Sequence, residues 1–282
     1  MSRILLAVLI VSWSAERVAA QPGPTDADFT KELQQLFSDV ASGYNVDAQF
    51  DGEMLPLQMR DEPIMHWTSR DGTNGEHVGS VFVWTHKQRP EVIGTIFTWR
   101  ATRDNIPSLE EFCTFSWERL LVRSQQGDTW EPEPLKMMRP IPDAPAPASS
   151  ERARRLQIRS LARNFSGRMH SIGEPHPLRL LPTPVYQYEC EDSNVSTGAV
   201  FAMVAFVTDP DIFFLIEART TADGPKWFYQ PVRFSDKSLW LDYKNKNVWK
   251  SVRAGHGSNG PDTPDPQYRL MRYSEHELPA VE

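Results

Sequence analysis

The feature that most constrains the fold is an internal repeat, which relates the segment from Pro56 to Arg100 to the segment from Pro177 to Arg219. Identical residues recur at a constant spacing of 119 positions within these segments and beyond them. The pairs are Gly79 and Gly198, Phe82 and Phe201, Arg100 and Arg219, Phe115 and Phe234, Leu120 and Leu239, and Trp130 and Trp249. A chance resemblance would not keep one register over so long a stretch, so the sequence predicts two homologous structural units.

Each unit begins with a segment whose apolar residues follow helical spacing. The first predicted helix has Thr25 or Asp26 as its cap, and its apolar stripe continues to about Ser42 and Gly43. The second predicted helix runs from Glu151 to Met169, with Leu156, Leu161 and Phe165 on one side and six arginines on the rest. In a chain of formal net charge −7, this arginine-rich surface indicates a solvated helix face rather than a nucleic-acid site.

The segments after the helices alternate apolar and polar residues as strands do. We therefore predict an α+β protein of two tandem homologous units, each with one amphipathic helix and an antiparallel sheet of about five strands. By analogy, each unit would be a roll of the cystatin or nuclear-transport-factor type, and a β-sandwich with peripheral helices is the alternative. In the second unit, 199–207 and 212–218 are apolar at nearly every position, which predicts strands buried on both faces.

The domain boundaries follow from the repeat and from composition. Residues 1–20 are predicted to be a signal peptide, 21–131 the first unit, 132–150 a Pro-rich linker, 151–253 the second unit, and 254–282 a mostly disordered tail. A short strand at Tyr268–Tyr273 is the exception expected within the tail.

The N-terminus predicts export. Arg3 precedes an apolar run from Ile4 to Trp13, and small residues end at Ala20, where cleavage is expected. No apolar run approaches the length of about 18 residues that a membrane span needs. We expect a secreted or periplasmic protein without a membrane span. Its acidic charge argues against a nucleic-acid partner, because such binding relies on cationic clusters.

The two cysteines, Cys113 and Cys190, fall at non-equivalent places in different units. In an oxidising compartment they would form a disulfide that joins the two units. The alternative is a pair of buried thiols that act as small apolar residues.

The repeat also sorts the aromatic residues. Residues matched between the units, such as Trp67 and Tyr188, are assigned to the shared core, and Gly79 and Gly198 mark turns or close approaches. Five tryptophans are unmatched and are candidates for ligand binding, because an exposed aromatic face can stack on a sugar ring or contact a partner. They are Trp84, Trp99, Trp117, Trp227 and Trp240. The alternative is that they fill the interface between two sheets.

Three histidines of the first unit, His66, His77 and His86, have no histidine counterpart in the second. If they converged, their imidazoles could bind zinc or copper, although their spacing matches no compact metal motif. The usual serine-nucleophile, zinc-protease and phosphate-loop motifs are absent, so the sequence identifies no catalytic residue and no cofactor.

The sequence of the second unit resembles those of an uncharacterised family of secreted bacterial proteins. The resemblance is carried by the stretches 180–188, 208–210 and 215–219, and it extends over most of the chain after the signal peptide. That family implies secretion, but it implies no activity and no site residues.

These observations favour a non-enzymatic binding or envelope-associated protein whose unknown ligand or protein partner meets a groove between the two units. One alternative is a hydrolase or metal-dependent enzyme in that groove, which would use the three histidines with a nearby carboxylate. Another is a structural or partner-docking protein. Convergent titratable groups would favour the enzyme, and an aromatic groove without them would favour binding.

Overall fold

The structure, a computed structural model, describes residues 26–71, 75–99, 101–136, 138–170, 175–190, 194–252 and 266–278. The predicted signal peptide, Arg100 and most of the predicted tail lie outside the described residues. In chain order the elements are α1 (Asp26–Ser42), β1 (Asn45–Phe50), β2 (Glu53–Pro56), β3 (Gln58–Met59), β4 (Met65–Asp71), β5 (Gly75–His86), β6 (Arg89–Trp99), β7 (Ile106–Thr114), β8 (Leu120–Arg123), β9 (Thr129–Trp130), β10 (Arg139–Pro140), α2 (Glu151–Ala162), β11 (Phe165–His170), β12 (His176–Leu180), β13 (Tyr186–Tyr188), β14 (Val195–Val204), β15 (Pro210–Thr221), β16 (Gly224–Arg233), β17 (Ser238–Tyr243), β18 (Lys246–Ser251) and β19 (Tyr268–His276).

The predicted α+β class, with one helix and about five strands in each unit, is wrong. The described part of the protein is mostly β, with 56% of those residues in strands and 12% in helices, and its large antiparallel sheets include a curled half-barrel. The prediction missed short strands beside the helices. One is β1, in which Val46 and Ala48 alternate into the core. Because such strands need only two or three inward residues, their period is easily overlooked next to a helix.

The strands form three antiparallel sheets. A six-stranded sheet has the order β19-β7-β6-β5-β3, with β4 also paired to β5. A nine-stranded sheet has the order β10-β16-β15-β14-β12-β11-β17-β18, with β13 paired to β14. A four-stranded sheet has the order β2-β1-β8-β9. The C-terminal strand β19 occupies the segment where a short strand is expected, and it pairs with β7 as far as His276.

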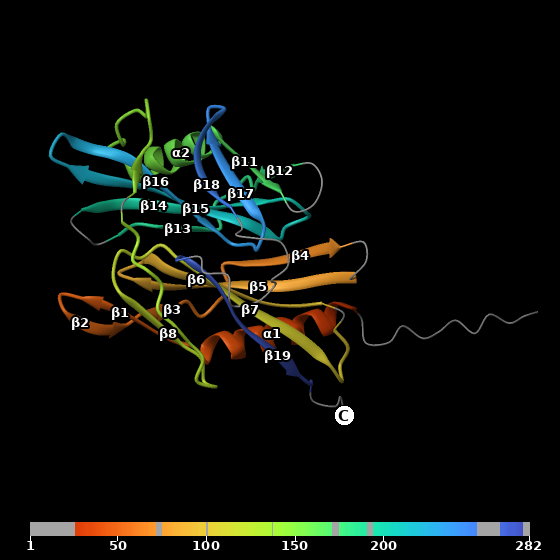
Figure 1. Cartoon of the computed structure of the whole chain (residues 1–282). Coiled ribbons are helices and arrows are strands. Elements are labelled where there is room, and N and C mark those ends of the chain that lie inside the picture. The colour runs from red at the N-terminus through yellow and green to blue at the C-terminus, as the bar shows by residue number, and fades with distance from the viewer. Residues whose placement is uncertain are drawn as a thin grey trace, which may run out of the picture.

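The two large sheets pack face to face, with α1 and α2 on opposite outer sides, as Figure 1 shows. The layer between the sheets contains Val81 and Ile93 of the six-stranded sheet and Val200 and Phe213 of the nine-stranded sheet, all 0% exposed. Burial of each such side chain contributes about 1.5–3 kcal/mol. This layer therefore holds the two sheets together.

The apolar strands β14 and β15 are buried on both faces, as their composition predicts, but β14 ends at Val204, and Phe206 and Val207 of the predicted run are exposed. Phe201 and Phe214 face α2 on the outer side, whereas Ala202 and Phe213 face the six-stranded sheet. Alternate side chains of one strand thus enter two different cores. A strand in this position has no polar face, which explains its continuous apolar sequence.

The second helix is shorter than predicted. It ends at Ala162, and the segment from Phe165 to His170 is strand β11. Its capping Ser150 accepts a hydrogen bond from the backbone N–H of Ala153. Leu156, which suggested the helical stripe, is 62% exposed. Within β11 every second side chain is buried and those between are partly buried or exposed, so the segment has the period of two of a strand and not the predicted period of 3.6.

The described residues between β9 and α2 form only the short strand β10, as their prolines require. This segment nevertheless binds to both large sheets. The backbone N–H of Leu135 donates to Ser116, and that of Ile141 donates to Trp227. Among the described residues, no helix has the length and apolar character needed to cross a membrane.

Two cross-strand pairs have the same local structure in the two large sheets. Gly79 pairs with Trp67, and Gly198 pairs with Tyr188. A Cβ atom added to Gly79 would lie 2.4 Å from the Trp67 ring, and one added to Gly198 would lie 2.2 Å from the Tyr188 hydroxyl oxygen. The aromatic ring therefore covers the glycine backbone in both cases. Two homologous units would share such a pair, but the internal repeat itself stays a prediction.

Replacement of Gly79 by alanine is expected to destabilise the protein by about 1–3 kcal/mol, because the new methyl group overlaps the Trp67 ring. Equilibrium denaturation in urea measures the effect. In a Trp67→Val background the ring is gone, so the same substitution should cost much less. Equal costs in the two backgrounds would contradict the close packing of ring on backbone.

Candidate functional site

The five candidate tryptophans separate into core and surface positions. Trp84 and Trp227 are each 1% exposed and belong to the cores beneath α1 and α2. Trp99, Trp117 and Trp240 are half-buried. Of the five, only Trp117 lines one of the two clefts described here.

The cleft beside Trp117, called the Trp117 cleft below, lies where the two large sheets meet. It has a volume of about 240 Å³ and is lined by Trp117, Lys136, Met138, Arg219 and Phe228. Trp117 follows β7 of the six-stranded sheet, and Arg219 and Phe228 come from β15 and β16 of the nine-stranded sheet. Lys136 and Met138 belong to the connecting segment, so three parts of the chain build the cleft.

Trp117 is held by two arginines. The guanidinium carbons of Arg89 and Arg219 each lie 4.0 Å from the centroid of its ring. A guanidinium this close to an aromatic face gains about 0.5–2 kcal/mol from the ring quadrupole. Arg89 is 6% exposed, whereas Arg219 reaches the cleft surface with 23% of its side chain exposed. The two contacts fix the indole at the rim.

A buried charged network supports the cleft from below. The Arg89 guanidinium donates through Nε to Glu217 Oε1 at 2.8 Å, through one terminal nitrogen to Glu91 Oε1 at 2.8 Å, and through the other to the Phe115 carbonyl at 3.2 Å. Glu217, which is 0% exposed, also accepts a hydrogen bond from the Tyr188 hydroxyl. Since Arg89 and Glu91 come from one sheet and Glu217 and Tyr188 from the other, the network joins the two sheets.

The network perturbs the titration of its members. Burial alone lowers the pKa of Arg89, but the carboxylates of Glu217 and Glu91 outweigh it and raise that pKa overall. Burial raises the pKa of Glu91, and Arg89 opposes this effect. Burial and then the charge of Glu217 raise the pKa of the Tyr188 hydroxyl, which therefore remains a protonated donor at neutral pH.

The lining of the Trp117 cleft is cationic and apolar. Lys136 and Arg219 supply positive charge, and neither Asp nor Glu is among the lining residues. The Arg219 guanidinium also lies 3.7 Å from Glu217 Oε2, which sits beneath the surface. The charged groups around the cleft are therefore three cations (Arg89, Arg219 and Lys136) and two buried carboxylates (Glu91 and Glu217).

Sequence reasoning identified Trp117 and missed its charged supports. Neither Glu91 nor Glu217 belongs to a motif that would single it out as a site residue. One signal was present in the sequence, because Glu217 stands inside the otherwise apolar run from Ile212 to Ala218. A carboxylate in a strand buried on both faces needs a buried partner. The identity of that partner, Arg89, depends on how the sheets stack.

The three candidate histidines do not come together. His77 and His86 stand near opposite ends of β5, nine positions apart, which corresponds to roughly 30 Å along an extended strand. His66 lies on β4, where its Nδ1 is 2.9 Å from Ser80 Oγ, and His86 stacks on Phe50. In the described part of the chain, no group of three or more His, Cys, Asp or Glu side chains could hold a metal ion.

The two cysteines are thiols in the structure. Cys113 is 0% exposed in the layer between the two large sheets, and Cys190 packs against the same apolar cluster. The Cys190 thiol donates to the Lys87 carbonyl at 3.4 Å. A disulfide between the two units stays a prediction.

No known protein family, no curated protein and no solved structure matches this chain. Its function must therefore be argued from its own site. The resemblance to uncharacterised secreted bacterial proteins stays an expectation from the sequence.

Proposed function

We propose that the protein is a non-enzymatic binding protein whose Trp117 cleft holds a small organic anion, namely a carboxylate with an apolar body. The observation that carries the proposal is the combination of Lys136 and Arg219 with the apolar surfaces of Trp117, Met138 and Phe228. Arginine and lysine recognise carboxylates, and a tryptophan offers a large contact area at little cost in entropy. The cleft is smaller than the 300–1,000 Å³ typical of drug-sized ligands, which favours a small molecule.

The rigidity of the site supports this proposal. The Arg89 network holds Trp117 from beneath, so the indole need not be ordered when a ligand binds. Pre-organisation of this kind removes part of the entropic cost of association. We further propose that the chain is exported through its predicted signal peptide and acts outside the cytoplasm.

Isothermal titration calorimetry with benzoate tests the proposal, with neutral benzamide as the matched ligand. We expect saturable binding of benzoate and much weaker binding of benzamide. Lys136→Met is expected to weaken benzoate binding roughly two- to fivefold, because an exposed charge contributes up to about 1 kcal/mol. Trp117→Leu is expected to weaken it about tenfold or more, since it removes the aromatic wall.

The control variant is Lys31→Met, which removes an exposed positive charge from α1, outside the cleft. It should leave benzoate affinity unchanged. Equal affinities for benzoate and benzamide, or equal effects of Lys136→Met and Lys31→Met, would show that the cleft does not select an anion.

A further inference from the structure

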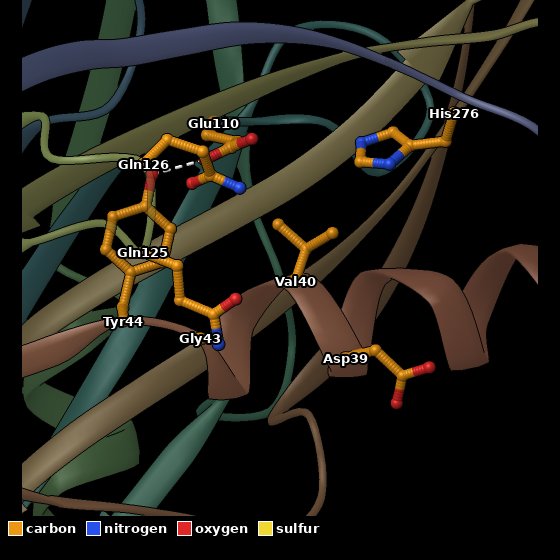
Figure 2. A pocket seen from close by; sticks show the side chains of 8 residues that line it. All are labelled: Asp39, Val40, Gly43, Tyr44, Glu110, Gln125, Gln126 and His276. Atoms are coloured by element: carbon orange, nitrogen blue, oxygen red, sulfur yellow. Dashed lines mark hydrogen bonds between the residues drawn. The ribbon is translucent and has the colours of Figure 1, made fainter.

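A second cavity lies at the C-terminal end of α1, on the side of the six-stranded sheet away from the sheet interface. This helix-end pocket has a volume of about 210 Å³ and shares no residue with the Trp117 cleft. Figure 2 shows its lining, which comes from α1 and the residues after it, from β7, from the β8–β9 loop and from β19. The lining residues are Asp39, Val40, Gly43, Tyr44, Glu110, Gln125, Gln126 and His276.

The central group of the pocket is the carboxylate of Glu110, which is 2% exposed. Its Oε2 accepts a hydrogen bond from the Tyr44 hydroxyl, the dashed line in Figure 2, and its Oε1 accepts one from the Ser274 hydroxyl at 3.0 Å. Both donors are neutral. A buried carboxylate is normally paired with a cation, because desolvation of the charge is costly.

Arg272, which stands opposite Glu110 on β19, directs its side chain elsewhere. Arg272 contacts Ser274 Oγ through Nε at 2.9 Å, and a terminal nitrogen of its guanidinium pairs with Asp128 Oδ2 at 2.6 Å. Arg272 therefore reaches Glu110 only through the Ser274 hydroxyl. Its guanidinium forms its ion pair with Asp128 and not with Glu110, whose carboxylate stands beside the pocket.

The rest of the lining adds no cationic side chain. Asp39 is exposed, and Figure 2 shows its carboxylate pointing away from Glu110, while the side chains of Gln125 and Gln126 end in neutral amides. The last turn of α1 contains no basic residue, so the partial negative charge at the helix end is not offset within the helix. Neither Lys nor Arg is among the lining residues. The negative charge inside the pocket therefore comes from Glu110 and from the end of α1.

The imidazole on the far wall is compatible with a cationic ligand. His276 Nε2 lies 3.0 Å from Ser108 Oγ. Burial lowers the pKa of His276; the charge of Glu110 opposes this effect, and Arg272 adds to it. At pH 7 the ring is therefore neutral and does not repel a positive charge. Tyr44, whose pKa is raised by burial and by Glu110, likewise stays a neutral hydrogen-bond donor.

We propose that the helix-end pocket binds the ammonium group of a small organic amine, with Glu110 as its counter-charge. The amine enters beside Tyr44 and His276, and Asp39 at the rim attracts it from solvent. The volume of the pocket limits the ligand to an amine with a short carbon chain. The site differs from the Trp117 cleft in both place and charge.

Amide chemical shifts of the ¹⁵N-labelled protein at pH 7 test the proposal, with propylammonium chloride as the probe and 1-propanol as the neutral ligand of similar shape. We expect saturable shifts at Gly43, Gln125 and Gln126 with propylammonium only. Glu110→Gln keeps the acceptor for Tyr44 and removes the charge, and it should weaken binding about tenfold or more, because the ammonium loses its charged hydrogen bond.

A second pair of variants keeps the test independent of the folding of the Glu110 variant. Gln126 is exposed, so a substitution there leaves the core intact. Gln126→Lys places an ammonium at the pocket and should abolish propylammonium binding, whereas Gln126→Met should keep the affinity within about threefold. Equal responses to propylammonium and propanol, or unchanged binding in Gln126→Lys, would overturn the proposal. Benzoate binding at the Trp117 cleft should be unchanged in all these variants, which separates the two sites.

Discussion

Replacement of Arg89 by methionine is expected to lower the free energy of unfolding by about 3–5 kcal/mol, the usual cost of leaving a buried charge without its partner. Arg89 pairs with both Glu91 and Glu217, at 2.8 Å each, and all three side chains are at most 8% exposed. Methionine fills much of the same volume but leaves Glu91 without its cation and Glu217 with only Arg219, at 3.7 Å, between the sheets. Equilibrium unfolding in urea at pH 7 measures the loss.

The matched control is Arg119→Met. Arg119 pairs with Glu131 at 2.9 Å, but the two side chains are 63% and 54% exposed. An exposed ion pair contributes about 0–1 kcal/mol, so this variant should remain close to the wild type. Addition of Glu91→Gln and Glu217→Gln to Arg89→Met should recover a large part of the lost stability, because the unpaired charges are then removed. Similar losses for Arg89→Met and Arg119→Met would refute a structural role for the network.

The Arg89 variant also bears on the Trp117 cleft. In the wild type the Arg89 guanidinium contacts the ring of Trp117. Without it, Arg219 is the remaining arginine that contacts the indole. The same network thus supports the fold and positions the proposed site. A binding site built over a structural ion pair is rigid as long as the two sheets remain packed.

The sequence predicted those parts of the fold that depend on local pattern. The first helix, the apolar strands β14 and β15, and the burial of matched aromatic residues such as Trp67 and Tyr188 were all foreseen. Each of these rests on periodicity or composition within a short window. The fold class was wrong because the number of strands and the pairing of sheets depend on contacts between distant segments, which no local pattern encodes.

The candidate site was predictable only in its aromatic part. Trp117 was selected because the repeat left it unmatched, and the structure places it in a cleft where the sheets meet. The same rule also selected Trp84 and Trp227, which are buried, since an unmatched residue can equally well fill one particular core. Glu110 gave no comparable signal, because its role depends on α1 and β19, which approach it from distant parts of the chain.

A second group of buried carboxylates lies where β7 meets the loops of the nine-stranded sheet. Burial raises the pKa of Glu111 to about 7, while a hydrogen bond from Tyr268 and the charge of Lys237 lower it and the charges of Asp236 and Asp211 raise it further. Burial also raises the pKa of Asp211 to about 6, although the Ala205 N–H, Ser235 and Lys237 stabilise its charge. These carboxyl groups therefore hold protons at a pH where the unfolded chain has released them.

Such groups make the protein less stable as the pH rises. A carboxyl group whose pKa is higher in the folded state contributes stability that is fully present below its unfolded pKa, and the contribution is lost as the pH rises through the folded pKa. For Glu111 this window runs from about 4.5 to about 7. The wild type is therefore expected to lose stability between pH 4.5 and pH 8, with Asp211 adding to the loss over a narrower range that ends near pH 6.

Glu111→Gln is expected to remove most of this loss, because glutamine resembles the protonated acid and still accepts the hydrogen bond from Tyr268. Each unit of pKa shift corresponds to about 1.4 kcal/mol, and the partial solvent exposure of Glu111 reduces the effect. The free energy of unfolding of the variant should therefore exceed that of the wild type by about 2–3 kcal/mol at pH 8 and equal it at pH 4.5. Unfolding in guanidinium chloride at pH 4.5, 6 and 8 measures the difference. Glu53→Gln, on the exposed edge strand β2, should show the pH dependence of the wild type. If the stability of the Glu111 variant fell with pH as steeply as that of the wild type, the proton would have to be held by Asp211 or by Asp209, whose pKa burial also raises.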